Sequence, residues 1–330
     1  MMHFRNKNSG LAIALAWPQT YCKQPGSWYD PVTEWLGINK NNYYRAGHAA
    51  TVLIDIKNKK CHYFDFGRYH APFRHGRVRS ADTDQDLIIK TVPKISSNGK
   101  KILNFADILN ELQQNTSCHG EGVLYASYCN IDFKSSISKA NLMQDFGPIL
   151  YGPFIREGSN CSRFVNSVIR AGNPEWKYQF RLKFFVPLTP TPLSNVKALT
   201  EKRFVPKLYN GHAFHPIHKL SIEELWSTLP APQKHEKIPE EAQWLSGEGA
   251  GSWFSINKKG NIVEISRYSP EGKMECSGMF NIRGHFVPGD LKNYQITHPS
   301  NCREIHLKKS DTILRLTKVS ASLSNLYKAV

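Results

Sequence analysis

One stretch, residues 158–165, constrains the fold of this chain most, because it places Cys161 where a loop turns into a helix. The Gly-Ser-Asn sequence before the cysteine consists of residue types that favour turns and helix N-caps. After the cysteine, apolar residues recur at helical spacing until Gly-Asn-Pro at 172–174 ends the pattern: Phe164, Val165, Val168 and Ile169. The pattern predicts a helix with Cys161 in its first turn, where backbone N–H groups and the helix dipole lower the pKa of a thiol.

His48 opens the run 48–56, whose aliphatic and β-branched residues are typical of a buried strand. Such a strand can place an imidazole at a sheet edge that faces the N-terminus of a helix. An isolated cysteine is more often a small core residue than a nucleophile, and this is the alternative interpretation of Cys161. The cap residues and His48 together favour a nucleophile with a histidine base.

The order of these elements carries a resemblance to a known family. A histidine starts a strand, a second strand follows, and a distant Asn-Cys-x-x-Phe-Val opens a helix. This order resembles the circularly permuted branch of the NlpC-type papain-like cysteine hydrolases, which includes relatives of lecithin:retinol acyltransferase, over roughly residues 10 to 190. The resemblance implies an α+β fold in which a helix carrying Cys161 packs against an antiparallel sheet carrying His48. It also implies a third polar residue that orients the imidazole, and it leaves open amide hydrolysis, ester hydrolysis or acyl transfer.

The pairing of two strands predicts the identity of the third residue. Residues 48–56 and 61–70 are separated by a short polar turn and are expected to form a hairpin. If burial places the apolar side chains on one face, two cross-strand pairs follow: Val52 with Phe66, and Ile54 with Phe64.

This register sets His70 opposite His48, so His70 is the predicted orienting residue. Asp65 takes the role if the pairing slips by an odd number of residues, and His62 is the third choice. The alternative for His70 is an ordinary loop histidine.

A basic segment follows the hairpin, with five side chains close together: Arg68, Arg74, His75, Arg77 and Arg79. Since Arg binds carboxylates and phosphates bidentately, one interpretation is a substrate clamp beside the nucleophile, with Arg68 as the predicted substrate-binding residue. The alternation of charges favours the other interpretation, an internal network with nearby aspartates: Asp65, Asp82, Asp84 and Asp86.

Two glycines, Gly152 and Gly158, bracket the approach to Cys161. They are expected to leave backbone N–H groups available to an oxyanion. Tyr151 and Asn160 are the nearest polar side chains and are predicted to contact the substrate. A structural turn with a stacked tyrosine is the alternative.

The chain carries 43 Lys and Arg against 27 Asp and Glu, a formal charge of +16, which raises the question of an anionic partner. The basic residues are spread along the chain and follow no zinc-finger, RNA-binding or helix-turn-helix pattern, so nucleic acid binding is not favoured. The expected substrate has an amide or ester bond, and the charge suits an anionic one such as a cell-wall peptide or a lipid. No cofactor is expected.

Seven cysteines without a C-x-x-C pair argue against a disulfide framework and favour a mostly reducing compartment or unpaired buried thiols. The apolar run 11–17 follows basic residues but is short for a signal peptide, so we predict that it is a buried strand. No run approaches the ~18 apolar residues of a membrane span. A cytoplasmic location is expected, and the N-terminal run leaves export open.

The composition divides the chain into three parts. Residues 1–190 are expected to form the papain-like catalytic domain, and residues 191–239 a proline-rich connector with one short helix at 221–226. Residues 240–330 show short alternating runs separated by turns, which predict a small antiparallel β domain without catalytic residues.

Three histidines in the connector are spaced three residues apart, as metal ligands on one helical face would be: His212, His215 and His218. Pro216 interrupts them and neither an acidic residue nor a cysteine lies close, so no metal site is predicted.

Two classes of function follow. The favoured one is a thiol hydrolase or transferase in which His48 activates Cys161. The alternative is a noncatalytic binding module on the same scaffold that recruits an anionic polymer or a protein partner.

Overall fold

The structure, a computed structural model, describes residues 9–24, 30–35, 39–199, 216–260, 262–282, 291 and 293–319. The chain forms two compact units. The first consists of residues 1–67, 76–81 and 87–226, and the second of residues 68–75, 82–86 and 227–330. Two short segments from the N-terminal half of the sequence, 68–75 and 82–86, therefore belong to the unit that is formed mainly by the C-terminal third.

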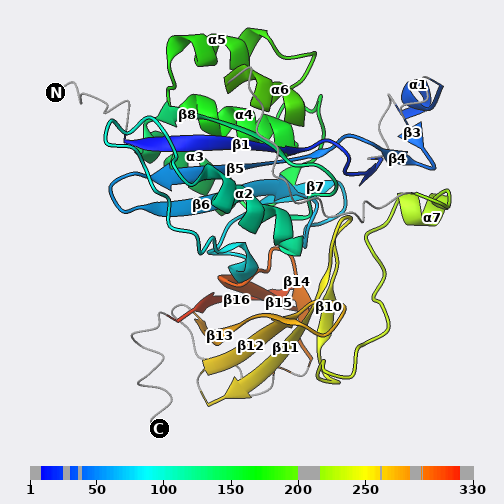
Figure 1. The fold of residues 1–330 in the computed structure, drawn as a ribbon. Helices are drawn as coiled ribbons and strands as arrows, with labels where there is room; N and C mark the ends of the chain where they lie inside the picture. The colour runs from blue at the N-terminus through cyan, green and yellow to red at the C-terminus, as the bar shows by residue number, and fades with distance from the viewer. Residues whose placement is uncertain are drawn as a thin grey trace. The chain divides into compact units, whose positions relative to one another are not determined.

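A six-stranded sheet forms the centre of the first unit (Figure 1). Its strand order is β8 (Tyr125–Ile131), β1 (Gly10–Trp17), β5 (His48–Asp55), β6 (Lys60–Gly67), β7 (His75–Arg79) and β9 (Ile149–Leu150). The pairs from β8 to β7 are antiparallel. A small second sheet, near helix α1 (Asp30–Trp35), consists of β2 (Cys22–Lys23), β4 (Tyr43–Tyr44) and β3 (Asn39–Lys40).

Helices cover both faces of the central sheet. Helix α2 (Phe105–Gln114) packs on one face and shares a core with the odd-numbered residues of β1. Helices α3 (Phe133–Asp145), α4 (Cys161–Ala171) and α6 (Pro192–Leu199) contribute to the core on the other face, which contains the even-numbered residues of β1. Because both faces are buried, β1 reads as an uninterrupted apolar run. The predicted N-terminal strand is confirmed.

The described part of the chain also contains the helical elements α5 (Trp176–Phe184), η1 (Gln85–Leu87) and η2 (Thr116–Cys118). Helix α5 packs against α6 and α4. Neither α5 nor α6 follows from the sequence pattern, because α6 lies among prolines and the exposed side of α5 is aromatic instead of polar. In the described part of the chain, every helix is too short or too polar to cross a membrane.

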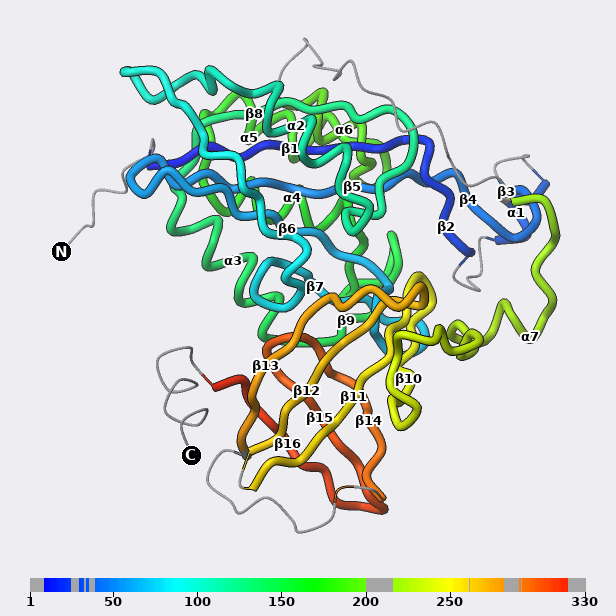
Figure 2. Tube along the Cα trace, turned by 60° about the horizontal axis from the view of Figure 1, so that its bottom comes forward, coloured from blue at the N-terminus to red at the C-terminus, as the bar shows by residue number. Residues whose placement is uncertain are grey.

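The second unit is an antiparallel seven-stranded sheet in the order β10, β11, β12, β13, β16, β15, β14, and it closes almost into a barrel (Figure 2). The bounds are β10 (Gln243–Leu245), β11 (Ser252–Lys259), β12 (Ile262–Tyr268), β13 (Met274–Ile282), β14 (Gln295–Thr297), β15 (Glu304–Lys309) and β16 (Thr312–Lys318). Gln243 bridges the two edge strands: its Nε2 donates to Tyr294 O at 2.8 Å, and its Oε1 accepts from Ile296 N at 2.7 Å. The α+β class and the all-β character of this region are confirmed. The predicted short helix is also present as α7 (Ile222–Leu225), with the capping box of Ser221 and Glu224.

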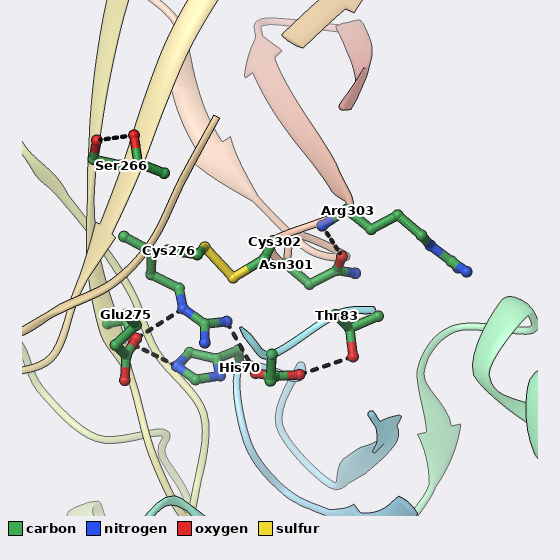
Figure 3. The surroundings of a disulfide bond; sticks show 12 residues. His70, Thr83, Ser266, Glu275, Cys276, Asn301, Cys302 and Arg303 are labelled. Atoms are coloured by element: carbon green, nitrogen blue, oxygen red, sulfur yellow. Dashed lines mark hydrogen bonds and ion pairs between the residues drawn. A yellow bond between two sulfur atoms is a disulfide. The ribbon is translucent and has the colours of Figure 1, made fainter. Parts of the chain in front are cut away.

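A disulfide joins Cys276 on β13 to Cys302 (Figure 3). The cysteine pattern predicted unpaired thiols, and for these two residues that prediction is wrong. The partners are 26 residues apart, and the β-sheet brings them together, so no local spacing could indicate the pair. The other cysteines that the structure describes are reduced: Cys22, Cys61, Cys118, Cys129 and Cys161.

Candidate active site

Cys161 is the first residue of α4, as predicted. The N-cap Asn160 has extended backbone angles, and its side-chain oxygen accepts a hydrogen bond from Arg163 N at 2.8 Å. The apolar stripe of the helix is fully buried, and Gly172 is its C-cap. The helix is therefore held against the sheet, and Cys161, which is 6% exposed, lies at its N-terminus.

Helix α6 fixes the first turn of α4 through one buried amide. The Nδ2 of Asn195 donates to Ser162 O at 2.9 Å, and its Oδ1 accepts from Asn166 Nδ2 at 3.0 Å. Asn195 is completely buried. Sequence reasoning missed this residue because it placed the segment in the connector, where an asparagine carries no signal.

The imidazole of His48 is positioned by the chain before it. Gly47 has a φ of 73°, and a Cβ there would lie 2.9 Å from Pro18 Cα, so the position requires glycine. Trp17, which pairs with His48 across β1 and β5, stacks on the imidazole with ring centroids 5.9 Å apart. The Trp17 indole donates in turn to Gln113 Oε1 at 3.0 Å. Trp17 and Gln113 are contributions to the site that the sequence analysis missed.

The hairpin of β5 and β6 is present, but the predicted register is wrong. Ala50 lies opposite Asp65 and Val52 opposite Tyr63, a shift by an odd number of residues from the predicted pairing. The prediction assumed one buried face. Since helices bury both faces of this sheet, apolar residues are needed on both, and they do not fix the register.

The observed register brings Asp65, not His70, to the face that carries His48. Asp65 Oδ2 lies 3.3 Å from His48 Nε2. Arg79, opposite Asp65 on β7, donates from Nε to Asp65 Oδ1 at 2.9 Å, and Tyr63 Oη donates to Oδ2 at 3.1 Å. Asp65 is completely buried and ion-paired with Arg79. The second choice of the sequence analysis is thus the carboxylate that faces His48.

The imidazole also forms a side-chain hydrogen bond with Cys161. Nε2 is the ring nitrogen that faces Asp65. Ser162 Oγ lies 3.8 Å from Cys161 Sγ, and the Ala49 backbone N–H also donates to the sulfur. A thiol, an imidazole and a carboxylate therefore stand in sequence, with Arg79 behind the carboxylate.

The pKa values of the three groups shift in a consistent way. Burial raises the pKa of Cys161, but the hydrogen bond and charge of His48 lower it more, and the net pKa is below its ordinary value. Burial lowers the pKa of His48, but Asp65 and Cys161 raise it well above its ordinary value. Burial raises the pKa of Asp65, yet Arg79 and His48 hold it well below its usual range. These directions favour a thiolate beside an imidazolium.

The pKa values of three other cysteines of the first unit shift in the opposite direction. Burial raises the pKa of Cys61 and of Cys118 to about 12, and it raises the pKa of Cys129 as well. Cys161 therefore differs from them in the direction of its shift, although it is also buried.

His70 belongs to the second unit. Its Nε2 lies 2.7 Å from Ser252 Oγ. The register that placed it opposite His48 is not formed, so the reason for assigning it the orienting role is lost. His62, the third choice, lies on β6, and its ring packs against Phe133 at 5.6 Å.

The predicted substrate-binding residues have structural contacts. Arg68 is buried in the second unit and forms an ion pair with Glu248 at 2.6 Å, a partner that lies outside the aspartates named for the network. Tyr151 stacks on Phe66 with ring centroids 5.8 Å apart, and Asn160 is the N-cap described above. That these residues bind substrate stays a prediction.

The expectation for the two glycines is wrong. Gly152 N donates to Ser159 O at 2.9 Å and Gly158 N to Ile155 O at 3.2 Å, so the turn itself uses both N–H groups. Sequence could not show this pairing, because it is formed by an irregular loop and not by a periodic element.

Among the residues that the structure describes, there is no group of three or more His, Cys, Asp or Glu residues that could hold a metal ion. His212 and His215 of the connector lie outside the described residues.

Comparison with known proteins gives two family matches. A family model described as "Type VI secretion system effector TseH-like" matches residues 12–178, just over half of the 330 residues. This match includes β5, β6 and all of α4, and with them Cys161, His48 and Asp65. A second model, the DUF6695 C-terminal domain, matches residues 242–319 of the β unit.

Among solved structures, the chain is similar to the crystal structure of the type VI secretion system effector TseH. The sequence identity is 18% and the TM-score 0.37, over 61% of this chain and 99% of that chain. No curated protein matches the chain.

Proposed function

The chain belongs to the TseH-like family of type VI secretion system effectors, and we propose that it acts as a cysteine hydrolase with Cys161 as nucleophile and His48 as its acid and base. One observation carries the proposal: the thiol at the start of α4 is hydrogen-bonded to an imidazole whose Nε2 faces a buried carboxylate. The residue types and the directions of their pKa shifts are those that a thiolate nucleophile requires.

The reaction starts from the thiolate–imidazolium pair. The Cys161 thiolate attacks the carbonyl carbon of an amide or ester, a C–S bond forms, and the carbonyl oxygen becomes an oxyanion. The N–H groups at the N-terminus of α4, which have no acceptor within the helix, are suited to stabilise it. The intermediate collapses, the His48 imidazolium gives its proton to the departing amine or alcohol, and an acyl-enzyme remains. His48 then takes a proton from water, which attacks the thioester and releases the acid and the thiol.

Asp65 and Arg79 are positioning residues in this scheme. Asp65 accepts a hydrogen bond from the His48 imidazole, whose Nε2 faces the carboxylate. This contact keeps Nδ1 directed at the sulfur and stabilises the imidazolium. Arg79 keeps Asp65 ionised despite its burial. Trp17 limits the rotation of the ring by stacking on it.

The effector family and the charge support a proposal for the substrate class. We propose hydrolysis of a cell-wall peptide, with a lipid ester as the second choice, since both carry the required bonds and anionic groups suit a chain with a net charge of +16. The order of His48 before Cys161 supports a circularly permuted NlpC-type arrangement. If an acceptor other than water attacks the thioester, the same site performs acyl transfer.

Trapping the acyl-enzyme tests this proposal. The purified chain is incubated with muropeptides, with a fluorogenic amide and with a phospholipid, then quenched in acid and digested for mass spectrometry. We expect an acyl adduct on the Cys161 peptide with one of these substrates, and free amine or alcohol in the supernatant.

Cys161→Ala is the test variant, and Cys129→Ala, at another buried cysteine of the same unit, is its matched control. Turnover that persists in Cys161→Ala would refute the proposed nucleophile. Turnover that disappears in both variants would show only a loss of folding, which a melting temperature detects. A reactive Cys161 without turnover of any substrate would favour the binding-module alternative.

A further inference from the structure

The largest concentration of exposed apolar side chains in the first unit lies on and just after α5. Five large residues there are exposed by 46 to 98%: Trp176, Phe180, Phe184, Phe185 and Leu188. We call these residues the α5 aromatic surface. Single exposed apolar residues are common, but a contiguous group of this kind marks an interaction site.

The sequence of α5 separates an inner face from an outer one. Trp176, Phe180 and Phe184 are four residues apart and form one stripe, whereas Tyr178 and Leu182, on the opposite side, pack into the core. The ring centroids of Phe180 and Phe184 are 4.9 Å apart, so the stripe is continuous. Figure 1 shows α5 at the outer edge of the first unit, on the side of α6 and α4 that is away from the sheet.

Basic side chains border the stripe. Lys177 and Lys183 lie on its two flanks by helical geometry, and Arg181 is one turn beyond Lys177. The ammonium of Lys183 is 4.8 Å from the centroid of the Phe184 ring. Between residues 175 and 188 the one acidic residue is Glu175, which pairs with Lys177 at 2.9 Å. The segment therefore combines exposed aromatic rings with net positive charge.

We propose that the α5 aromatic surface binds the surface of a lipid bilayer that contains anionic lipids. A Trp and Phe stripe flanked by Lys and Arg suits this occupant: the rings enter the boundary between headgroups and acyl chains, and the cations face the anionic headgroups. The stripe projects outward from the domain, which fits a planar surface better than a cleft-bound peptide. The binding is peripheral and does not depend on the proposed hydrolase activity, because α5 contributes no residue to the site of Cys161.

The test is co-sedimentation of the full chain with vesicles. One set consists of phosphatidylcholine alone, and the other also contains phosphatidylglycerol at about a third of the lipid. We expect binding to the second set, at least about tenfold weaker binding to the first, and weakening with added salt.

Trp176→Ser/Phe180→Ser/Phe184→Ser should weaken binding to the anionic vesicles by at least about tenfold, because each serine removes apolar area from the lipid contact. Trp35→Ser is the matched control: Trp35 is 84% exposed on α1 and should not contribute. All substituted residues are exposed, so the melting temperature should stay within a few degrees of the parent value.

A second variant, which lacks the basic side chains beside the stripe, tests the contribution of positive charge to vesicle binding. Lys177→Ala/Arg181→Ala/Lys183→Ala should weaken binding to anionic vesicles, whereas removal of three exposed lysines on another part of the first unit, Lys94→Ala/Lys100→Ala/Lys101→Ala, should change it less than twofold. The proposal is overturned if the parent chain does not bind anionic vesicles, or if it binds both vesicle sets equally. It is also overturned if the aromatic variant binds the anionic vesicles as tightly as the parent does. The same holds if the α5 aromatic surface binds a protein and does not bind vesicles.

Discussion

Two buried clusters of charged and polar side chains, one in each unit, are built from similar residues and differ in what the histidine contacts. In the first unit, His48 lies between the Cys161 thiol and the Asp65 carboxylate, and Arg79 pairs with Asp65. The imidazole therefore has a nucleophilic atom on one side and a fixed anion on the other.

In the second unit, the partner of the histidine is a hydroxyl that is already engaged. Ser252 Oγ donates to Glu275 Oε2 at 2.8 Å and accepts from His70 Nε2 at 2.7 Å. Arg267 then joins Glu275 at 2.7 Å to Asp84 at 3.0 Å, next to the disulfide (Figure 3). Each contact ties a segment to the β-sheet, and Ser252 lies within a strand, without a helix N-terminus beneath it.

The two clusters together show that a buried histidine with a nearby carboxylate and arginine does not by itself indicate catalysis. What distinguishes the first cluster is a sulfur at the N-terminus of a helix, hydrogen-bonded to the imidazole that faces the carboxylate. Such a network without a nucleophile, as in the second unit, is expected to hold segments together. The predictions below separate these two roles.

Cys161→Ala should have the largest effect. We expect turnover to fall by at least about 10³-fold, because no other group can form the thioester. The free energy of unfolding of this variant should change by about 1 kcal/mol or less, since one sulfur atom is removed and the Cβ stays. Initial rates measure turnover, and urea unfolding measures the free energy of unfolding. A large loss of stability with retained turnover would show that Cys161 is a structural residue and not the nucleophile.

Asp65→Asn and His70→Ala compare the two clusters directly. Asp65→Asn should lower turnover by about 10²- to 10³-fold, because the imidazolium loses its anion and the ring its fixed orientation. His70→Ala should leave turnover within about twofold and destabilise the chain by about 1–3 kcal/mol, because Ser252 loses a buried hydrogen-bond partner.

If His70→Ala instead costs turnover and Asp65→Asn does not, the observed register of β5 and β6 is not the functional one. Asp65→Asn rather than Ala is the better test, since it leaves an oxygen to accept from Arg79.

Cys276→Ser/Cys302→Ser should act on stability alone. Loss of a disulfide between residues 26 apart is expected to cost about 2–4 kcal/mol of unfolding free energy. The rate of Cys161 alkylation should not change. Measuring alkylation and unfolding in the same preparation checks both, and a slower alkylation would show that the second unit influences the first cluster.

The smallest expected effect is a pH dependence of stability. The pKa of Asp65 is lower in the folded chain than its ordinary value of 3.8, so its contribution is fully present above that pH and is lost as the pH falls through the folded pKa. Between pH 5 and pH 2 the difference in unfolding free energy between the parent and Asp65→Asn should therefore shrink. A difference that grows toward acid pH would contradict the ion pair with Arg79.

Sequence was sufficient for elements with a strong period and for the place of Cys161 at the start of α4. The stripe after Cys161 defined α4, and the alternating runs of the C-terminal third predicted the strands of the β unit. In both cases the pattern reports burial on one side, which periodicity can encode.

The sequence was insufficient where contacts between elements that are far apart in the chain determine the structure. The register of β5 and β6 depends on a sheet buried on both faces, so Asp65 came second to His70. Asn195 and the disulfide are defined by the packing of α6 and by the β-sheet. These positions have no local signal that a single sequence could reveal.

The central measurement is the rate of iodoacetamide alkylation of each cysteine in the native full chain as a function of pH, followed by peptide mass spectrometry. Cys161 should react fastest, with a rate that reaches its plateau below the ordinary thiol pKa of 9.0, because the folded chain lowers its pKa. Cys61 and Cys118, whose pKa burial raises to about 12, should stay unreacted in that range. A Cys161 that reacts only above pH 9, or no faster than in His48→Ala, would contradict the thiolate–imidazolium pair.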